Sequence, residues 1–216
     1  RVQRRPATRA GPPTPGRRPA SPNPRPPRAG PTARAAPVPA RKPRVATVSL
    51  AGCFGCHMSF LDLDERLFEL FERVDFDRTP LNDVKTLQPC DIGLVEGGLC
   101  NAENVHVLRE FRARCKLLVA VGACSINGGL PAQRNALDVG RMLIEVYRDR
   151  PGLAPGSEVP SDPELPLPLA RVHPIHEVVH VDHFLPGCPP SAETIGELLF
   201  ALLDGRPPRL PPLPYH

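Results

Sequence analysis

Residues 44–56 read RVATVSLAGCFGC, an apolar, β-branched run that leads into a loop with glycines and two cysteines. β-branched residues favour strands, and glycine allows the tight turn with which a strand can end. We therefore predict a strand over Arg44–Leu50 and, after it, a loop that carries Cys53 and Cys56. The same arrangement, an apolar run followed by a distinctive loop, recurs further along the chain.

Alternation of strands and helices continues through the rest of the sequence. Further strands are predicted at Asp91–Val95, Lys116–Val121 and Val178–Phe184, where apolar residues run together. Helical periodicity predicts helices at His57–Val74, Asn104–Cys115, Arg134–Arg148 and Ser191–Leu203, the last with Ser191 as N-cap. Residues 150–168 are rich in proline and are predicted to form a loop. This order predicts an α/β fold, with a parallel sheet and helices on both of its faces.

The first 43 residues differ in composition from the rest. Residues 1–43 hold 13 Pro, 10 Arg and one Lys with no acidic residue, whereas residues 44–216 hold 16 basic and 23 acidic residues. A segment so poor in apolar residues cannot bury enough surface to offset its ordering entropy. We predict a disordered, basic, Pro-rich tail over residues 1–43 and one domain over residues 44–216. The tail could touch nucleic acid or anionic lipid, but we expect solvated disorder and no nucleic-acid partner.

No apolar stretch reaches the length needed to span a membrane, and none follows the arginine pairs of the tail as an export signal would require. We therefore expect no membrane span and a cytoplasmic location. Disulfides are rare in a reducing compartment. Metal binding is thus the leading use for grouped cysteines among the seven in the chain.

Four cysteines lie in loops rich in glycine or proline that follow predicted strands: Cys53 and Cys56 in AGCFGC, Cys124 in GACSINGG and Cys188 in PGCPP. In open α/β sheets, ligands bind outside the carboxyl ends of the strands, so the fold rule and the cysteine positions agree. Four thiolates suit zinc or an iron–sulfur cluster. Structural zinc usually takes closely spaced pairs. The gaps here are 2, 67 and 63 residues, which favours a cluster.

Three other kinds of protein remain open on these residues. A Cys-x-x-Cys pair after a strand also serves thiol–disulfide exchange, although such an enzyme has no need of Cys124 and Cys188. A flavodoxin-like protein would bind FMN, but its phosphate loop would stand where this chain has Cys53 and Cys56, so FMN would need another binding mode. A zinc-stabilised binding module would have no redox role. The chain has no dinucleotide fingerprint, so we expect NAD to bind a different subunit.

Two residues near the second predicted strand are candidates for a place beside the metal group. Glu96 ends that strand and precedes Gly97-Gly98. Its side chain either faces the proposed cluster or interacts with the N-terminus of a helix. Cys100 lies just past this turn and could approach the cluster.

The remaining thiols and a series of histidines have simpler explanations. Cys90 and Cys115 flank predicted strands, and we expect them to be small core residues. An extended strand would divide the histidines between its two faces. We therefore predict exposed or interface side chains, and no metal site, for His173, His176, His180 and His183.

Taken in order, four motifs resemble a known family. They are Cys53-Phe54-Gly55-Cys56, Glu96-Gly97-Gly98, Gly122–Gly129 around Cys124, and Pro186–Pro190 around Cys188. They resemble the small subunits of nickel–iron hydrogenases and the related cluster-bearing subunit of respiratory complex I, over about residues 44–205. The resemblance implies a flavodoxin-like, doubly wound scaffold. It also implies one [4Fe-4S] cluster held by Cys53, Cys56, Cys124 and Cys188.

Two details narrow the resemblance. The complex I subunit has adjacent cysteines in its first motif, whereas Cys53 and Cys56 have the hydrogenase spacing. No cysteine follows Cys188, as in the short, single-cluster type of small subunit. The stretches Ala51–Arg66 and Val119–Asn135 look most like the small subunit of the NAD-reducing, bidirectional soluble hydrogenase.

The resemblance implies an oxidoreductase subunit that transfers electrons and has no site of its own for H2 cleavage. Its cluster would relay electrons between the nickel–iron centre of a large subunit and diaphorase subunits that carry FMN and iron–sulfur clusters. A complex I-like or F420-type electron-transfer subunit, with the same cluster but another redox partner, stays open as an alternative.

Overall fold

The computed structural model describes residues 41–210 of the chain. The predicted disordered tail lies outside these residues, apart from its last three. The described part is built around a five-stranded sheet in the order β2-β1-β3-β5-β7, in which all neighbours pair in parallel. Its strands are β1 (Arg44–Ser49), β2 (Asp75–Phe76), β3 (Cys90–Glu96), β5 (Cys115–Val121) and β7 (His183–Leu185).

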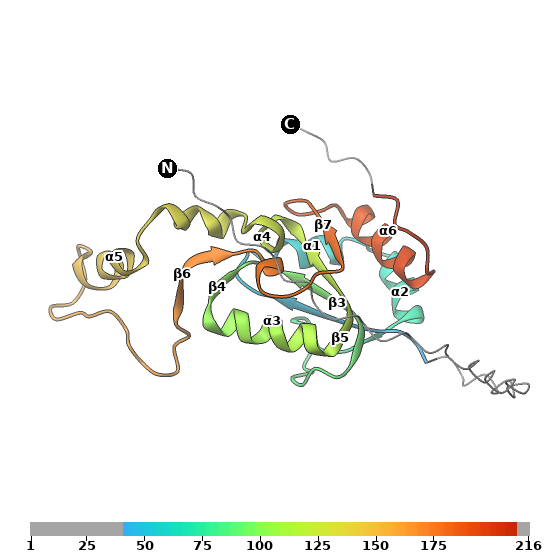
Figure 1. Ribbon diagram of the computed structural model, residues 1–216, viewed down its shortest axis with the longest axis horizontal. Coiled ribbons are helices and arrows are strands. Elements are labelled where there is room, and N and C mark those ends of the chain that lie inside the picture. Colours follow the sequence, from blue (N-terminus) through green and yellow to red (C-terminus); the bar gives the residue numbers. More distant parts are fainter. Residues whose placement is uncertain (1–40, 211–216) are drawn as a thin grey trace, which may run out of the picture. The chain divides into compact units, whose positions relative to one another are not determined.

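This strand order is that of the flavodoxin-like, doubly wound fold, in which β2 lies on one side of β1 and the later strands lie on the other. The predicted fold class is therefore confirmed. The described residues also form six α-helices (Figure 1). They are α1 (Gly55–Leu61), α2 (Arg66–Arg73), α3 (Ala102–Arg114), α4 (Gly122–Asn127), α5 (Val139–Ile144) and α6 (Ala192–Leu203).

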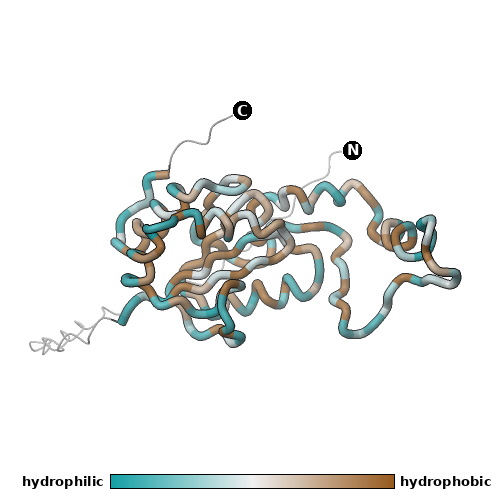
Figure 2. The backbone as a smooth tube through the Cα atoms, turned by 180° about the vertical axis from the view of Figure 1, so that it is seen from behind, coloured by the Kyte–Doolittle hydropathy of each residue, from teal (hydrophilic) through white to brown (hydrophobic). Residues whose placement is uncertain are grey.

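The sheet separates two hydrophobic cores, because successive strand residues point to opposite faces. On one face Leu94 of β3 packs with Phe60 of α1 and Ile195 of α6. On the other face Leu118 of β5 packs with Phe111 of α3. The central strands are accordingly mostly hydrophobic along their length (Figure 2). Both faces of the sheet are thus covered, as the sequence predicts.

A second, smaller sheet consists of two antiparallel strands, β4 (Leu99–Asn101) and β6 (Pro168–His173), which the sequence analysis missed. Both strands are short, and β6 directly follows the proline-rich stretch, so neither shows a long apolar run. Between α4 and β6, residues 130–167 extend away from the main sheet and include α5 (Figure 1). Within η1 (Leu130–Ala136) and α5 no side chain is buried.

The helix predicted over His57–Val74 is in fact two helices, α1 and α2, separated by a turn at residues 62–65. Asp64 in this turn has a left-handed φ of 49°. Aspartate tolerates that conformation better than most residues, because its short polar side chain can bond locally. The apolar periodicity continues across the turn, which explains why the sequence predicted one helix.

Two further element predictions were partly wrong. Within the helix predicted over Arg134–Arg148, the residues up to Ala136 form a 3-10 helix, and α5 begins only after Asp138. The Asp138 side chain caps α5 by accepting a hydrogen bond from the Arg141 N–H. The strand predicted over Val178–Phe184 is reduced to β7, because only His183–Leu185 pairs with β5. The other predicted strands and helices are present within one or two residues, and Ser191 caps α6 as predicted. No helix within residues 41–210 combines the length and the apolar character needed to cross a membrane.

Removing a side chain from the core should destabilise the fold strongly. Phe111 is completely buried, so Phe111→Ala should lower the free energy of unfolding by about 3–5 kcal/mol. Phe68 is 72% exposed, so Phe68→Ala should change the free energy of unfolding by less than about 0.5 kcal/mol. Urea titration followed by circular dichroism measures both, and equal losses would contradict the core described here.

Candidate metal centre

Four strands of the main sheet end in one row. Ser49 of β1 pairs with Glu96 of β3, Glu96 pairs with Val121 of β5, and Val121 pairs with Leu185 of β7. Since the strands are parallel, the loops that follow them leave the sheet at the same edge. The row therefore brings together segments that lie far apart in the sequence.

The loops are also joined to one another by backbone hydrogen bonds. Ala51 and Gly98, which follow β1 and β3, donate to each other's carbonyl oxygens at 3.0 and 2.8 Å. The Ala123 N–H, after β5, donates to the Gly187 carbonyl, after β7, at 2.7 Å. These bonds link the loops in two pairs, so the four loops are fixed relative to the sheet and to their neighbours.

The four candidate cysteines lie at this edge. Cys53 and Cys188 are in loops, whereas Cys56 lies in the first turn of α1 and Cys124 lies in α4, where the sequence predicted a loop. Burial, together with the negative charges of Glu96, Cys124, Cys53 and Cys188, raises the pKa of Cys56 to about 12. Burial also raises the pKa of Cys124, although a hydrogen bond from the Leu130 N–H opposes the shift. The thiols are therefore close enough to act on one another electrostatically, as the sequence motifs predict.

The four thiols differ in exposure. Cys56 and Cys124 are half-buried, and the Cys56 thiol lies 3.7 Å from the Val121 carbonyl oxygen at the end of β5. Cys53 and Cys188 are exposed. One side of the group thus rests on the sheet edge, and the other side faces outward.

Two glycines leave room for the half-buried sulfurs. A Cβ atom on Gly122 would collide with the Cys56 Sγ, and one on Gly129 would lie 2.7 Å from the Cys124 Sγ. Both glycines have positive φ values, 82° and 49°, which other residues adopt with strain. The glycines of these motifs therefore serve both the backbone turn and the close approach of a sulfur.

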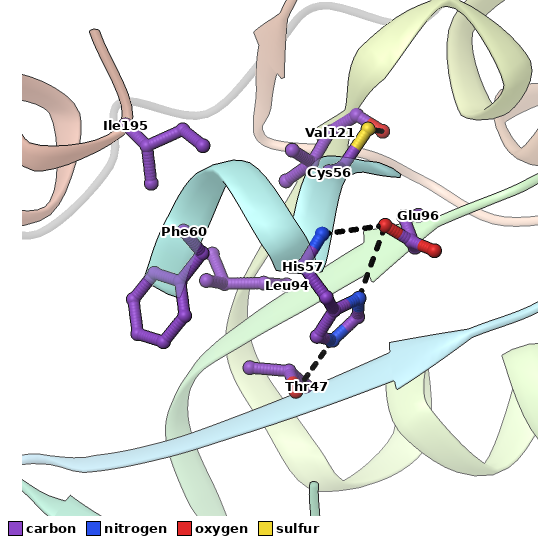
Figure 3. A pocket seen from close by; sticks show the side chains of 8 residues that line it. All are labelled: Thr47, Cys56, His57, Phe60, Leu94, Glu96, Val121 and Ile195. Atoms are coloured by element: carbon purple, nitrogen blue, oxygen red, sulfur yellow. Dashed lines mark hydrogen bonds and ion pairs between the residues drawn. The ribbon is translucent and has the colours of Figure 1, made fainter. Parts of the chain in front are cut away.

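Glu96 is buried at the centre of the row, where it is 3% exposed. One carboxylate oxygen accepts from the Ser49 hydroxyl at 2.7 Å, and the other accepts from the His57 backbone N–H at 2.9 Å. The His57 Nδ1 lies 3.0 Å from that second oxygen but out of line for a good hydrogen bond, and its Nε2 lies 2.8 Å from the Thr47 hydroxyl (Figure 3). A carboxylate buried in this way would be unstable without these partners.

The contacts of Glu96 keep it ionised. Burial by itself would raise the pKa of this carboxyl, but hydrogen bonds from His57 and Ser49, together with the charge of His57, lower it below its usual value. A cavity of about 20 Å³ adjoins the network and is lined by Cys56 and Glu96 among others (Figure 3). That volume is enough for about one water molecule.

The sequence left two places open for Glu96, facing the cluster or accepting a hydrogen bond from a helix N-terminus, and the bond from the His57 N–H in the first turn of α1 agrees with the second. The sequence did not point to Ser49 and His57, which bond Glu96, or to Thr47, which contacts His57. A signal for Thr47 and Ser49 was present, because both are polar residues at alternate positions of a β-branched strand and so lie on the same face. His57 could not be found in this way. Its role depends on a contact with a strand 39 residues further along the chain.

The three remaining cysteines lie outside the group of four candidate ligands. Cys90 and Cys115 are buried, 1% and 4% exposed, and belong to the core on the α3 face. The Cys100 thiol donates to the Asn104 side-chain oxygen at 3.3 Å, within the β4–α3 junction. Of the histidines predicted to be exposed, His173 pairs with Glu177 at 2.6 Å and its side chain is 40% exposed.

Within residues 41–210, no three side chains of His, Cys, Asp or Glu lie close enough to hold a single metal ion. The four cysteines nevertheless form a donor set of the kind that binds an iron–sulfur cluster, in which each thiolate ligates a different iron. Glycine at positions 122 and 129 lets the backbone lie directly against the two inner sulfurs. Cys53, Cys56, Cys124 and Cys188 could therefore hold such a cluster.

Comparison with known proteins gives concordant matches. Residues 53–202 match the family described as NADH ubiquinone oxidoreductase, 20 Kd subunit. The delta subunit of the NAD-reducing hydrogenase HoxS of Cupriavidus necator is 45% identical over 173 residues, which cover 79% of this chain and 83% of the relative. One subunit of the vhu F420-non-reducing hydrogenase of Methanococcus voltae is 36% identical over 80% of this chain. The match spans 60% of that longer relative.

Solved structures agree with these matches. A chain in the crystal structure of an NAD+-reducing [NiFe]-hydrogenase in the H2-reduced state superposes with a TM-score of 0.79 and 62% identity. The match covers 82% of this chain and 99% of that one. A chain of the [NiFeSe]-hydrogenase of Dm. baculatum superposes with a TM-score of 0.50 at 20% identity. The match covers 81% of this chain and 68% of that one, and at this identity it shows a shared fold alone.

The contact between Gly122 and Cys56 can be tested with a matched pair of glycines. Gly122 and Gly152 both have positive φ values, so Gly→Ala at either should cost about 1–2 kcal/mol of stability. A Cβ at Gly152 meets nothing within 4 Å, whereas one at Gly122 meets the Cys56 sulfur. Gly122→Ala should therefore lose a further 1–3 kcal/mol or so through overpacking. Thermal unfolding compares the two variants, and equal losses would mean that the sulfur does not lie over Gly122.

Proposed function

The chain belongs to the family of the NADH ubiquinone oxidoreductase 20 Kd subunit, and from its similarity to the HoxS delta subunit and to a chain of an NAD+-reducing [NiFe]-hydrogenase we propose that it is the electron-transfer subunit of a NAD-reducing nickel–iron hydrogenase. The observation that carries the proposal is the gathering of Cys53, Cys56, Cys124 and Cys188 at one edge of the sheet. These residues would hold one [4Fe-4S] cluster, which supplies one-electron transfer when it is bound.

The protein's own residues bind and orient that group. Cys56 and Cys124 provide the inner ligands, next to the sheet edge, and Cys53 and Cys188 provide the outer ones. Burial favours the protonated forms of the Cys56 and Cys124 thiols, so these two would lose their protons when they bind iron. The backbone bonds between the loops would hold the ligands in place relative to one another. The chain needs no group of its own that cleaves H2.

Exposed apolar side chains on the elements that carry the cysteines support a partner at this face. Met58 of α1 is 53% exposed, Leu130 just after α4 is 65% exposed, and Phe184 of β7 is 44% exposed. Such side chains, on or directly after the elements that lead into or carry the cysteines, suit burial against another subunit. We assign that place to the large subunit with the nickel–iron centre. The electrons would pass on to diaphorase subunits with FMN and iron–sulfur clusters, in the cytoplasm.

A second candidate function differs only in the redox partner. A further relative, from Methanococcus voltae, is the gamma subunit of a coenzyme F420 hydrogenase, and the family takes its description from a complex I subunit. The same cluster could therefore serve a complex I-like or F420-type complex. Purification of the native complex and identification of its other subunits would separate these candidates.

We also propose that residues 44–216 act as one domain, with residues 1–43 dispensable for cluster content.

Metal analysis tests the ligand set. The anaerobically purified complex should contain about four iron and four sulfide for this chain's cluster in addition to those of its partner subunits, and each of Cys53→Ser, Cys56→Ser, Cys124→Ser and Cys188→Ser should lower that content. Cys100→Ser is the matched control and should keep it, because a serine hydroxyl can still donate to Asn104. One zinc per chain would refute the cluster, and iron loss in the control would make Cys100 a ligand.

The relay is tested by two activities of the assembled complex. In Cys124→Ser, hydrogen-dependent reduction of NAD should collapse, because electrons from the nickel–iron centre no longer have a path. NADH-driven dye reduction at the flavin subunit should survive, since it does not need this chain. Both activities falling together in a complex that is still assembled would show that the cluster does not connect the two centres.

A further inference from the structure

One side chain beside the cysteine loops joins three separate elements. His57 belongs to α1, its Nε2 lies 2.8 Å from the Thr47 hydroxyl of β1, and its Nδ1 lies 3.0 Å from the Glu96 carboxylate of β3 (Figure 3). Its backbone N–H donates to the same carboxylate oxygen. Since His57 directly follows Cys56 in the chain, whatever fixes His57 also limits the movement of Cys56.

The ring of His57 is held from the side of the first cysteine loop as well. It stacks on the ring of Phe54, with the centroids 4.7 Å apart and the planes within 3° of parallel. Phe54 is itself part of the Cys53–Cys56 loop and has a left-handed φ of 67°. The ring is therefore held from three sides, by Thr47, Glu96 and Phe54.

We propose that His57 is a positioning residue for the cluster, which holds the Glu96 carboxylate and the Cys53–Cys56 loop in one arrangement. A fixed negative charge then lies beside Cys56. Thr47 acts through His57 by holding Nε2, and neither residue is a ligand. This inference rests on the proposed function, since it concerns the group that Cys56 would bind.

The arrangement has consequences that differ from those of core packing. A carboxylate fixed beside the cluster opposes the addition of an electron, because charges interact strongly where water is excluded. A carboxylate that varies in orientation from molecule to molecule would instead give the cluster several environments. The reduction potential and the width of the EPR lines of the reduced cluster therefore report on positioning.

Thr47 offers the sharpest test, because its hydroxyl can be removed while the strand keeps its shape. Thr47→Val preserves the β-branched side chain and removes the partner of Nε2, whereas Thr47→Ser keeps the hydroxyl and loses the methyl group. Both variants are compared in the anaerobically purified complex. The Thr47→Val complex should keep its iron, and the EPR lines of its reduced cluster should broaden. The ratio of oxidised to reduced cluster at a fixed potential should change at least threefold. Thr47→Ser should resemble the unsubstituted protein.

Two further variants make the test independent of Thr47. His57→Phe keeps an aromatic ring on Phe54 and removes both nitrogens, so it should reproduce the change seen in Thr47→Val. The double variant should change no further, because both substitutions break the same contact. Glu96→Gln removes the charge itself and should raise the potential, with a shift in the ratio of about tenfold, or 59 mV for one electron.

The outcomes separate this inference from the proposed function. An unsubstituted complex without the four iron and four sulfide assigned to this chain, beyond those of its partner subunits, would overturn both. A complex that carries the cluster, but in which Thr47→Val leaves the EPR lines and the potential unchanged, would overturn the role of His57 alone. The same holds if Thr47→Ser changes them as much as Thr47→Val, because the methyl group and not the hydroxyl would then be responsible. Rescue by serine together with an effect of His57→Phe would establish positioning.

Discussion

The row formed by Ser49, Glu96, Val121 and Leu185 is the constraint on which the rest of the site depends. These residues pair side by side where four parallel strands end, so the loops that follow all begin at one level. A slip of β3 by one residue would turn Glu96 to the opposite face of the sheet, toward α3, and leave an apolar side chain in its place. The register of the sheet thus decides which side chains meet the cysteine loops.

The buried charge at the centre of this row couples the sheet to the first cysteine loop. Taking a carboxylate out of water is costly, and the cost falls only if hydrogen bonds replace the lost hydration. Here Ser49 supplies one bond from the neighbouring strand, and the His57 N–H supplies another from α1. The helix that carries Cys56 is therefore held by the same contacts that make the buried Glu96 tolerable.

The gradient of burial across the four thiols gives the site two sides. Cys56 and Cys124 rest against the sheet edge, where Gly122 and Gly129 leave space for their sulfurs. Cys53 and Cys188 face outward, near apolar side chains that solvent does not favour. An inner side that fixes a charged network and an outer side open to a partner suit a group through which electrons enter or leave the protein.

The sequence by itself determined the fold class, the strands β1, β3 and β5, the helices α3 and α6 and the three segments that carry the cysteines, because apolar periodicity and glycine placement are local signals. It could not determine the break between α1 and α2, the helix α4, the strands β2, β4 and β6, or the short extent of β7, since these depend on pairing and packing with distant segments. The tertiary structure alone decided that His57 contacts both Thr47 and Glu96, because the three residues lie on separate elements that meet only when parallel strands come into register. Local chemistry thus marks the ligands, whereas the groups that orient them become visible only in the folded chain.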